Sequence, residues 1–304
     1  MRRPRSDVRT ATAVLVSTVL VAACVARADG MPMGHRGTGT APVALATAAP
    51  TDDAPAAETA FDGLDARVRQ ASSEAADAGA AISIVALDRK TGQIVSNGKD
   101  VSLPIASVAK LFIADDLLLQ VSKGQMQLSP DDVRAFDAML SSSDDGAADV
   151  FWNRSGGSDI INRVTARYGL RSTTAPYNGH WDVTLSTASD LVRYYDKLLG
   201  NGGGLPADQA DKIINDLSQS TPTGVDGYPQ RFGIPDGLFA SPVAVKQGWF
   251  CCWDSGDQLH LSTGVIGSDH RYVMTIGALQ PTSDAVARNT LTKAVKTMFP
   301  TGKI

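Results

Sequence analysis

The chain has 304 residues, a formal net charge of −4 and a hydrophobic fraction of 43%. A mildly acidic chain of this kind has no excess of basic residues to attract a polyanion, which excludes nucleic-acid binding as a main function. The length suffices for one domain of ordinary size, and no internal repeat is visible in the sequence.

The first 23 residues predict export from the cytoplasm. Four arginines within residues 2–9 precede an apolar stretch over residues 11–23 that is too short to span a bilayer. The stretch ends in Val-Ala-Ala-Cys at Cys24, which resembles the lipobox of a bacterial lipoprotein signal. The resemblance implies cleavage before Cys24, lipidation of that cysteine, and anchoring to the extracytoplasmic face of the cell membrane. The alternatives are an ordinary secretory signal or a poor transmembrane helix.

Residues 24–57 predict a flexible tether, because a stretch rich in Ala, Thr, Pro and Gly cannot bury enough apolar surface to fold. Removal of residues 1–23 takes away four positive charges and one negative charge, so the formal net charge changes from −4 to −7. Residues 58–304 remain as one domain. We expect this domain to be a monomer without a cofactor. We also expect no metal, since no Cys/His spacing suggests a metal site.

Hydrophobic periodicity predicts the secondary structure of residues 58–304. A helix over residues 61–78 precedes a hairpin with strands at 81–88 and 93–96. Helices are then predicted at residues 107–123, 131–140, 146–152, 158–168 and 189–199, followed by strands at 243–248, 258–266 and 271–279 and a helix at 284–298. This order predicts an α+β fold in which one antiparallel sheet is built from both chain ends and flanked by a helical block.

The helix over residues 107–123 places a serine and a lysine one turn apart. Ser107 and Lys110 face the same side, so the lysine amine can reach the serine hydroxyl. This face also carries Ala114, Leu117 and Leu118, whereas Asp115, Asp116, Gln120 and Lys123 lie on the opposite side. Apolar surroundings lower the pKa of a lysine, so Lys110 could activate Ser107 as a nucleophile. The alternative is a helix-capping serine followed by a lysine that extends to solvent.

Two further motifs follow along the chain. Ser143-Asp144-Asp145 lies within a stretch of small residues at 139–149, and Lys246-Gln247-Gly248 lies on a predicted strand. With the first motif and the predicted architecture, they resemble the serine β-lactamase and penicillin-binding-protein family, whose signature is S-x-x-K, S-D-N and K-T-G. The resemblance covers essentially all of residues 60–300. It is strongest to the class A branch and, more narrowly, to the LppW-type bacterial lipoproteins.

The resemblance implies a role for each matched residue. Ser107 would attack a carbonyl carbon, and Lys110 would help to remove its proton. Ser143 would pass a proton toward the leaving nitrogen, and Lys246 would hold Ser143 and attract the substrate carboxylate. The backbone N–H groups of Ser107 and Trp249 would form an oxyanion hole. The implied substrates are β-lactams or peptidoglycan peptides.

The sequence departs from the family signature at two binding positions. Asp145 replaces the usual Asn, so a carboxylate stands where an amide would donate, and it could pair with Lys110 or Lys246. Gln247 replaces the Thr or Ser whose hydroxyl binds the substrate carboxylate. We still expect the substrate site to be formed by Asp145, Gln247, Gly248 and Trp249.

Residues 173–182 stand where class A β-lactamases carry the glutamate that activates water for deacylation. This segment has no glutamate; Asp182 is its only carboxylate, and we expect His180 to be a loop histidine. We therefore expect acylation on Ser107 with poor deacylation, as in a weak β-lactamase or a DD-peptidase-like protein. The alternatives are a non-catalytic cell-envelope binding or scaffold lipoprotein and a serine esterase.

Cysteines and aromatic residues leave two questions open. Cys251 and Cys252 are neighbours, and two free, buried thiols are at least as compatible with the sequence as a strained bridge. For the aromatic residues close to these motifs, core packing competes with ligand stacking; they are Tyr177, Trp181, Trp249, Phe250 and Trp253.

Overall fold

The computed structural model describes residues 61–253 and 256–304. The signal segment at residues 1–23, the lipidation of Cys24 and the tether up to residue 57 lie outside the described residues and stay predictions. Within the described ranges, no helix is both long and apolar enough to cross a membrane.

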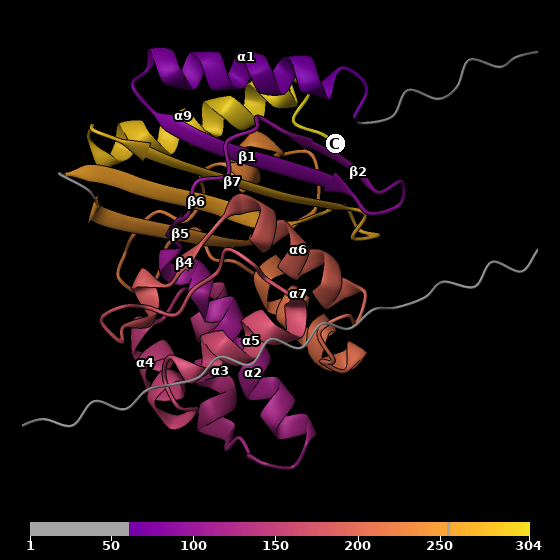
Figure 1. Cartoon of the computed structure of the whole chain (residues 1–304), viewed down its shortest axis with the longest axis vertical. Coiled ribbons are helices and arrows are strands. Elements are labelled where there is room, and N and C mark those ends of the chain that lie inside the picture. The colour runs from indigo at the N-terminus through magenta and orange to yellow at the C-terminus, as the bar shows by residue number, and fades with distance from the viewer. Residues whose placement is uncertain (1–60, 254–255) are drawn as a thin grey trace, which may run out of the picture. The chain divides into compact units, whose positions relative to one another are not determined.

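An antiparallel sheet of five strands joins the two ends of the domain, in the order β2-β1-β7-β6-β5 (Figure 1). The N-terminal hairpin supplies β1 (Ala81–Asp88) and β2 (Gln93–Ser96). The C-terminal part supplies β5 (Val243–Trp253), β6 (Asp257–Ile266) and β7 (Tyr272–Gln280). β1 pairs with β7 over its whole length, with Ala81 opposite Leu279. The predicted α+β fold with a sheet built from both chain ends is confirmed.

Helices cover both faces of this sheet. α1 (Leu64–Asp77) and α9 (Asp284–Met298) pack together on one face, and the helical block lies on the other (Figure 1). Strands β1, β6 and β7 are consequently buried along nearly their whole length, since each is covered on both sides. Sequence periodicity located these three strands and both covering helices to within a few residues of their ends.

The helical block contains elements that the sequence located only in part. Its longer helices are α2 (Lys110–Ser122), α3 (Pro130–Ser141), α4 (Asp145–Arg154), α5 (Asp159–Tyr168), α6 (Ala188–Leu199) and α7 (Ala207–Ser218). Short elements complete it: β3 (Leu103–Pro104) paired with β4 (Leu185–Ser186), the 3₁₀ helices η1 (Ala106–Ala109) and η2 (Trp181–Val183), and α8 (Ile234–Gly237). We did not predict α7, although its buried apolar residues recur at helical spacing.

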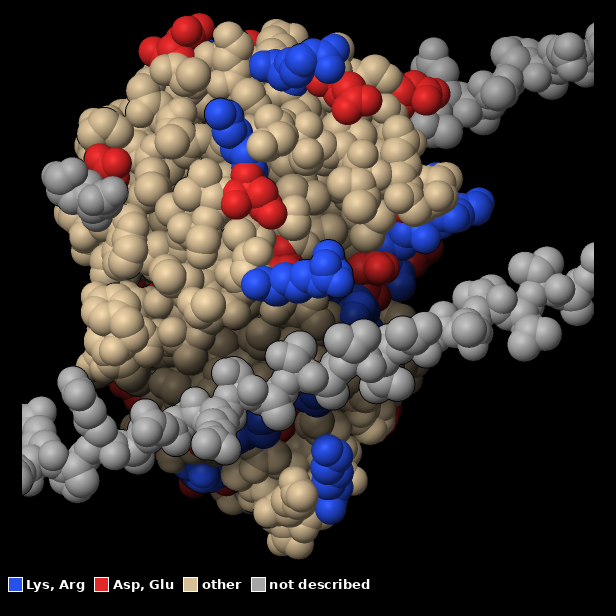
Figure 2. Space-filling view, in the orientation of Figure 1, with Lys and Arg blue, Asp and Glu red and all other residues tan. Residues whose placement is uncertain are grey.

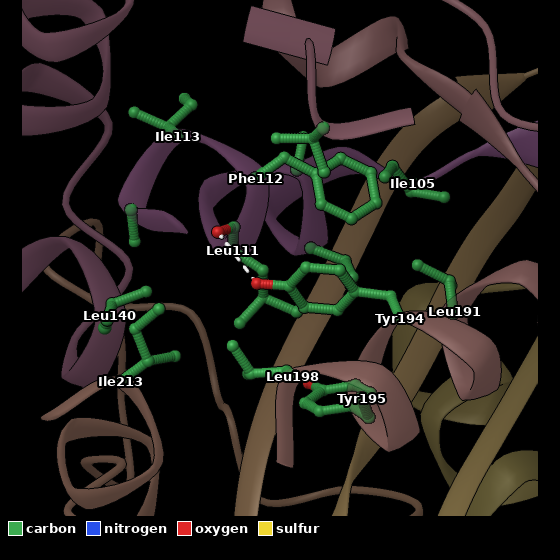
Figure 3. Packing of buried hydrophobic residues seen from close by; sticks show 14 of the residues in the cluster. Ile105, Leu111, Phe112, Ile113, Leu140, Leu191, Tyr194, Tyr195, Leu198 and Ile213 are labelled. Carbon is green, nitrogen blue, oxygen red and sulfur yellow. Dashed lines mark hydrogen bonds between the residues drawn. The ribbon is translucent and has the colours of Figure 1, made fainter. Parts of the chain in front are cut away.

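Helix α2 runs through the centre of the helical block and is buried on all sides. Every residue from Lys110 to Leu119 is buried. Figure 3 shows α2 side chains such as Phe112 and Ile113 packed among residues of α3, α6 and α7, with the Tyr194 hydroxyl donating to the Leu111 carbonyl oxygen at 3.3 Å. On the side of this helix that we expected to be polar, Asp115 and Asp116 are therefore buried, whereas Gln120 is partly exposed and Lys123 is exposed.

Two consecutive aspartates of α2 are buried against arginines of α5. Asp115 is 0% exposed and accepts hydrogen bonds from Arg167 and Tyr168. Asp116 is 1% exposed and accepts from two nitrogens of Arg163, at 2.9 and 2.7 Å. Arg163 and Arg167 are four residues apart, so they share one face of α5 and meet both carboxylates. These pairs allow two charges to be buried in a helix that is otherwise apolar.

Surface charges are mixed on the face that Figure 2 shows. Lys and Arg side chains lie next to Asp and Glu side chains there, and the described residues of that face form no large patch of either sign. Among the ion pairs of the described residues is that of Arg89 with Asp196, at 3.0 Å.

Replacement of Asp115 by Ala should destabilise the fold strongly, because Arg167 would keep its charge in a site where its side chain is only 19% exposed. We expect a loss of about 3–5 kcal/mol in the free energy of unfolding, measured by urea denaturation. Asp131→Ala is the control, since Asp131 and its partner Arg134 are 85% and 71% exposed. It should cost less than about 1 kcal/mol. Equal losses in the two variants would contradict the assignment.

Candidate active site

Ser107 lies in the 3₁₀ turn η1, immediately before α2. The α-helix itself begins at Lys110, so Ser107 precedes the regular helix that we expected it to open. The segment is held in place on its N-terminal side, where Ile105 N donates to the Thr184 carbonyl oxygen at 2.9 Å. Ser107 is 6% exposed and Lys110 is 0% exposed. The serine thus borders the cavity described below, while the lysine lies behind it in the protein interior.

Lys110 is the centre of a hydrogen-bond network. Its Nζ atom lies 2.8 Å from Ser107 Oγ, 3.1 Å from Ser143 Oγ and 2.9 Å from the Ser143 carbonyl oxygen. It also pairs with the Asp145 carboxylate. Lys246 Nζ approaches the same network from the sheet and donates to Ser143 Oγ at 2.8 Å. The structure therefore brings Ser107, Lys110, Ser143 and Lys246 within hydrogen-bond reach of one another, from three separate segments of the chain.

Ser143 is placed by an unusual turn between two helices. α3 ends at Ser141, and the Asp144 side chain caps α4 by accepting from Ala147 N at 3.0 Å. The intervening Ser143 has a φ of 57°, in the left-handed region that a residue with a side chain seldom adopts. Ala106, next to Ser107, has a φ of 46°. Strained backbone thus occurs on both sides of the network, a pattern that is frequent at functional sites.

Strand β5 approaches the serine closely because it has a glycine there. A Cβ atom at Gly248 would lie 2.6 Å from the Ile105 carbonyl oxygen, too close for any residue with a side chain. Lys246 precedes this glycine and is 1% exposed. Its carbonyl oxygen accepts from Thr263 Oγ1 of β6 at 2.9 Å, which ties the strand to its neighbour. The glycine therefore fixes how near the sheet comes to the segment that carries Ser107.

Burial governs the protonation of both lysines. Burial lowers the pKa of Lys110 below its usual range, while the neighbouring Asp145 charge opposes that effect. Burial also lowers the pKa of Lys246 well below its usual range, and the positive charge of Lys110 lowers it further. A neutral amine at Lys110 has a lone pair and can accept a proton from Ser107. The environment thus favours a lysine that can act as a base.

A cavity of about 230 Å³ opens directly onto Ser107. The residues that line it are Ala106, Ser107, Asp145, Trp181, Asp182, Trp249, Phe250 and Cys251. Trp249 stacks on Tyr228, with ring centroids 4.4 Å apart, which fixes one wall of the cavity. Asp145 and Trp249 therefore both line the cavity beside Ser107, and their role in substrate binding stays a prediction.

Gln247 lies outside the cavity, contrary to the prediction. Its Nε2 donates to the carbonyl oxygens of Gln230 and Phe232 at 2.9 and 2.6 Å, and the residue is 0% exposed. Adjacent side chains of a strand point to opposite faces, so Gln247 points away from the side on which Lys246 meets Ser143. The substrate-binding role that we predicted for the Gln247 side chain is therefore wrong.

The loop before α6 makes contacts with the site that the sequence did not predict. Lys110 Nζ lies 4.6 Å from the Trp181 ring centroid, and the indole N–H donates to Asp149 Oδ1 at 2.7 Å. Asp182 follows Trp181 into the cavity wall. Tyr177 and His180 are exposed and are absent from the lining of this cavity. Only the aromatic cluster and the position of Asp182 in the loop hinted at these contacts, since periodicity cannot place a loop.

Cys251 and Cys252 are joined by a disulfide and are exposed. Of the two alternatives that the sequence left open, the structure has the bridge, and β5, which continues past Gly248 to Trp253, carries Cys251 to the rim of the cavity. In the described part of the chain, no group of three His, Cys, Asp or Glu residues could hold a metal ion.

Comparisons with known proteins agree with this architecture. A model of the Beta-lactamase enzyme family matches residues 64–134. A Mycobacterium tuberculosis protein named as lipoprotein LppW is 60% identical over 253 residues, which cover 83% of this chain and 80% of that protein. The Mycobacterium bovis protein of the same name matches equally.

Solved structures of similar fold have low sequence identity to this chain. A β-lactamase from Chitinophaga pinensis has a TM-score of 0.62 at 14% identity, covering 77% of this chain and 98% of that one. The structure of PBP-A has a TM-score of 0.64 at 18% identity, with coverages of 78% and 95%. A class A β-lactamase from Mycobacterium abscessus has a TM-score of 0.59 at 20% identity, with coverages of 77% and 98%. At these identities the likeness establishes the fold alone.

Replacement of Gly248 by Ala should separate β5 from the Ser107 segment, since the added methyl group would meet the Ile105 carbonyl oxygen. We expect a loss of about 1–3 kcal/mol in the free energy of unfolding, measured by urea denaturation. Gly277→Ala in β7 is the matched control, because its Cβ atom would lie 3.4 Å from Leu261 Cγ, an ordinary contact. Equal stability of the two variants would refute the close approach at Gly248.

Proposed function

This chain belongs to the LppW lipoprotein family and has the fold of the class A β-lactamases, and from this premise we propose that it forms a covalent acyl-enzyme on Ser107. The proposed acyl donors are β-lactams or peptidoglycan peptides, with deacylation much slower than acylation. We further propose that lipid on Cys24 anchors the chain to the extracytoplasmic face of the cell membrane, consistent with its relatives being named as lipoproteins.

One observation carries the proposal: an unbroken path of hydrogen bonds from Ser107 through Lys110 to Ser143 and Lys246. Ser107 Oγ gives its proton to neutral Lys110 and forms a bond to the carbonyl carbon of the donor. The carbon–nitrogen bond of the donor then breaks. The proton passes from Lys110 through the Ser143 hydroxyl to the leaving nitrogen, so Lys110 returns to its neutral state and the acyl group stays on Ser107.

The close approach of β5 supports stabilisation of the carbonyl oxygen during this attack. In the family that the chain resembles, the backbone N–H groups equivalent to those of Ser107 and Trp249 bind that oxygen. Gly248 brings the strand against the Ile105–Ser107 segment, so both backbones lie at the same side of the cavity. An oxyanion-hole donor of this kind contributes about 2.7–4 kcal/mol to catalysis.

Slow deacylation follows from the loop at residues 173–182. Hydrolysis of the acyl-enzyme needs a base that activates water, and this loop has no glutamate. Asp182 lines the cavity from this loop, but its side chain is one methylene shorter than that of a glutamate. A variant of PBP-A has been crystallised as an acyl-enzyme complex with penicillin G, which is the kind of complex that we propose for this chain.

The ion pair between Lys110 and Asp145 favours a second candidate, a non-catalytic binding lipoprotein. An ammonium group held by a carboxylate has no lone pair and cannot take the proton of Ser107. In that case the cavity would bind a ligand without reacting. Formation of a covalent adduct separates the two candidates.

A fluorescent penicillin at high concentration should label the wild-type protein, with a mass increase of one acyl group that persists after removal of free penicillin. Ser107→Ala should give no adduct. Ser142→Ala is the control for loss of a serine near the site, because the Ser142 hydroxyl bonds the Ala138 carbonyl oxygen instead of joining the network. Intact-protein mass spectrometry measures all three. An adduct in Ser107→Ala, or none in the wild type, would refute the proposal.

Asp145→Asn should make acylation faster at neutral pH. The rate requires neutral Lys110 and therefore rises with pH through the pKa of that amine, which burial lowers. The carboxylate of Asp145 opposes the lowering of the Lys110 pKa, as do Asp144 and Asp226, and only Asp145 contacts the amine. Replacement of the Asp145 carboxylate by a neutral amide should lower the Lys110 pKa further, so the acylation rate should rise at lower pH than in the wild type. A pH series of labelling rates measures this shift. Asp131→Asn, on exposed α3, should leave the profile unchanged; a shift to higher pH in Asp145→Asn would contradict the mechanism.

A further inference from the structure

Every charged side chain in the wall of the Ser107 cavity is acidic. Asp145 and Asp182 line it, and no Lys or Arg does so among the described residues. The Asp145 side chain is 66% exposed, so its charge faces the space that a ligand would occupy. A ligand that enters this cavity therefore meets two carboxylates before it reaches the serine.

The two lysines of the network are not available to bind an anionic ligand. Lys110 and Lys246 are 0% and 1% exposed, and both amines are committed to hydrogen bonds behind Ser107. Burial also lowers the pKa of both amines below the usual range of a lysine. Lys110 pairs with Asp145, whose side chain nevertheless stays 66% exposed, and neither lysine pairs with Asp182 in the described part of the chain.

Other groups near the cavity do not reverse this charge. Arg288 stacks on the face of Tyr228, with its guanidinium carbon 5.0 Å from the ring centroid, and pairs with Asp284. Tyr228 in turn stacks on Trp249, so this arginine contacts the back of the wall and is already neutralised. Gln247, whose counterpart in the family would help to bind a carboxylate, points away from the cavity.

The remaining walls are aromatic, which suits a positively charged ligand. Trp181, Trp249 and Phe250 line the cavity. Aromatic ring faces attract cations, and the Trp181 ring centroid lies 4.6 Å from Lys110 Nζ. Clusters of aromatic faces form a recognised arrangement for binding quaternary ammonium groups.

We propose that this cavity selects acyl donors that carry an ammonium group and disfavours those that carry a carboxylate. The inference rests on the proposed function for the transfer step, but its charge preference applies equally to non-covalent binding. A donor with a positive group beside its reactive carbonyl would be placed between Asp145, Asp182 and the aromatic walls. The substrate class would then be a peptide or amide with a free amino group near the scissile bond.

Three forms of benzylpenicillin that differ in charge test the proposal: the free acid, the 3,3-dimethylbutyl ester and the choline ester. The two esters have the same shape, because carbon replaces the quaternary nitrogen. At low salt the choline ester should acylate Ser107 about tenfold faster than the neutral ester, corresponding to about 1.4 kcal/mol, and the free acid should be slowest. The preference should shrink as salt screens the carboxylates. Equal rates for the two esters would overturn the proposal.

Variants of the two carboxylates test whether the cavity wall causes the preference for the choline ester. Asp182→Asn should reduce the choline preference, and the Asp145→Asn, Asp182→Asn double variant should abolish it. Asp77→Asn is the matched control, since Asp77 lies at the end of α1, on the other face of the sheet (Figure 1), and it should keep the full preference. An unchanged preference in the double variant would refute the role of these carboxylates.

Binding to Ser107→Ala separates this proposal from the proposed function. That variant cannot be acylated, and the fluorescence of Trp181 and Trp249 reports occupancy of the cavity. Tighter binding of the choline ester than of the 3,3-dimethylbutyl ester would support the charge preference even if the wild type formed no adduct, which would overturn only the acyl-enzyme proposal. Equal binding would overturn the charge preference whatever the wild type does.

Discussion

The burial of one amine organises the site. Lys110 is fully enclosed, and a buried amine is stable only where oxygen atoms surround it. Those oxygens come from η1, from the turn between α3 and α4, and from the start of α4. The turn adopts a left-handed conformation at Ser143 that places both the hydroxyl and the carbonyl oxygen of this residue against the amine. Strain in the turn and solvation of the lysine are therefore parts of one arrangement.

Helix α2 also buries two aspartates about one turn after Lys110. Asp115 and Asp116 are as deeply buried as Lys110, and α5 supplies their partners. α2 thus carries three buried ionisable side chains, each with its own partners, within an apolar surrounding. Exchanges among these groups would leave charges unpaired, so the pattern specifies how α2 packs against α4 and α5.

The sequence was sufficient for those parts of the fold and site that depend on local spacing. The distance of one turn between Ser107 and Lys110 predicted that their side chains meet, and runs of strand-forming residues bounded by turn residues predicted β1, β6 and β7. Ser143 and Lys246 could be added only through the family resemblance, because nothing local connects three segments so far apart in the chain. The burial of Asp115 escaped prediction because its partner Arg167 lies on another helix.

The direction of Gln247 and the environment of Trp181 depend on tertiary contacts. A strand buried on both faces has no polar side by which to judge orientation, so the side of β5 that faces the cavity is set by Gly248 packing against Ile105. Trp181 lies in the loop before α6, where the sequence has no hydrophobic periodicity from which the direction of its side chain could be predicted. Its place against Lys110 follows from a hydrogen bond to Asp149 on a different element.

The pairing of β1 with β7 has a consequence for how the domain is assembled. Ala81 lies opposite Leu279, so roughly 200 residues must be available before this ladder can close. A chain that emerges N-terminus first, from a ribosome or a membrane channel, presents β1 long before its partner. Until then the hairpin of β1 and β2 exposes an unpaired edge, and its apolar residues need protection from other chains. In such a chain the sheet can be completed, and Lys246 placed against Ser143, only after β5, β6 and β7 have emerged.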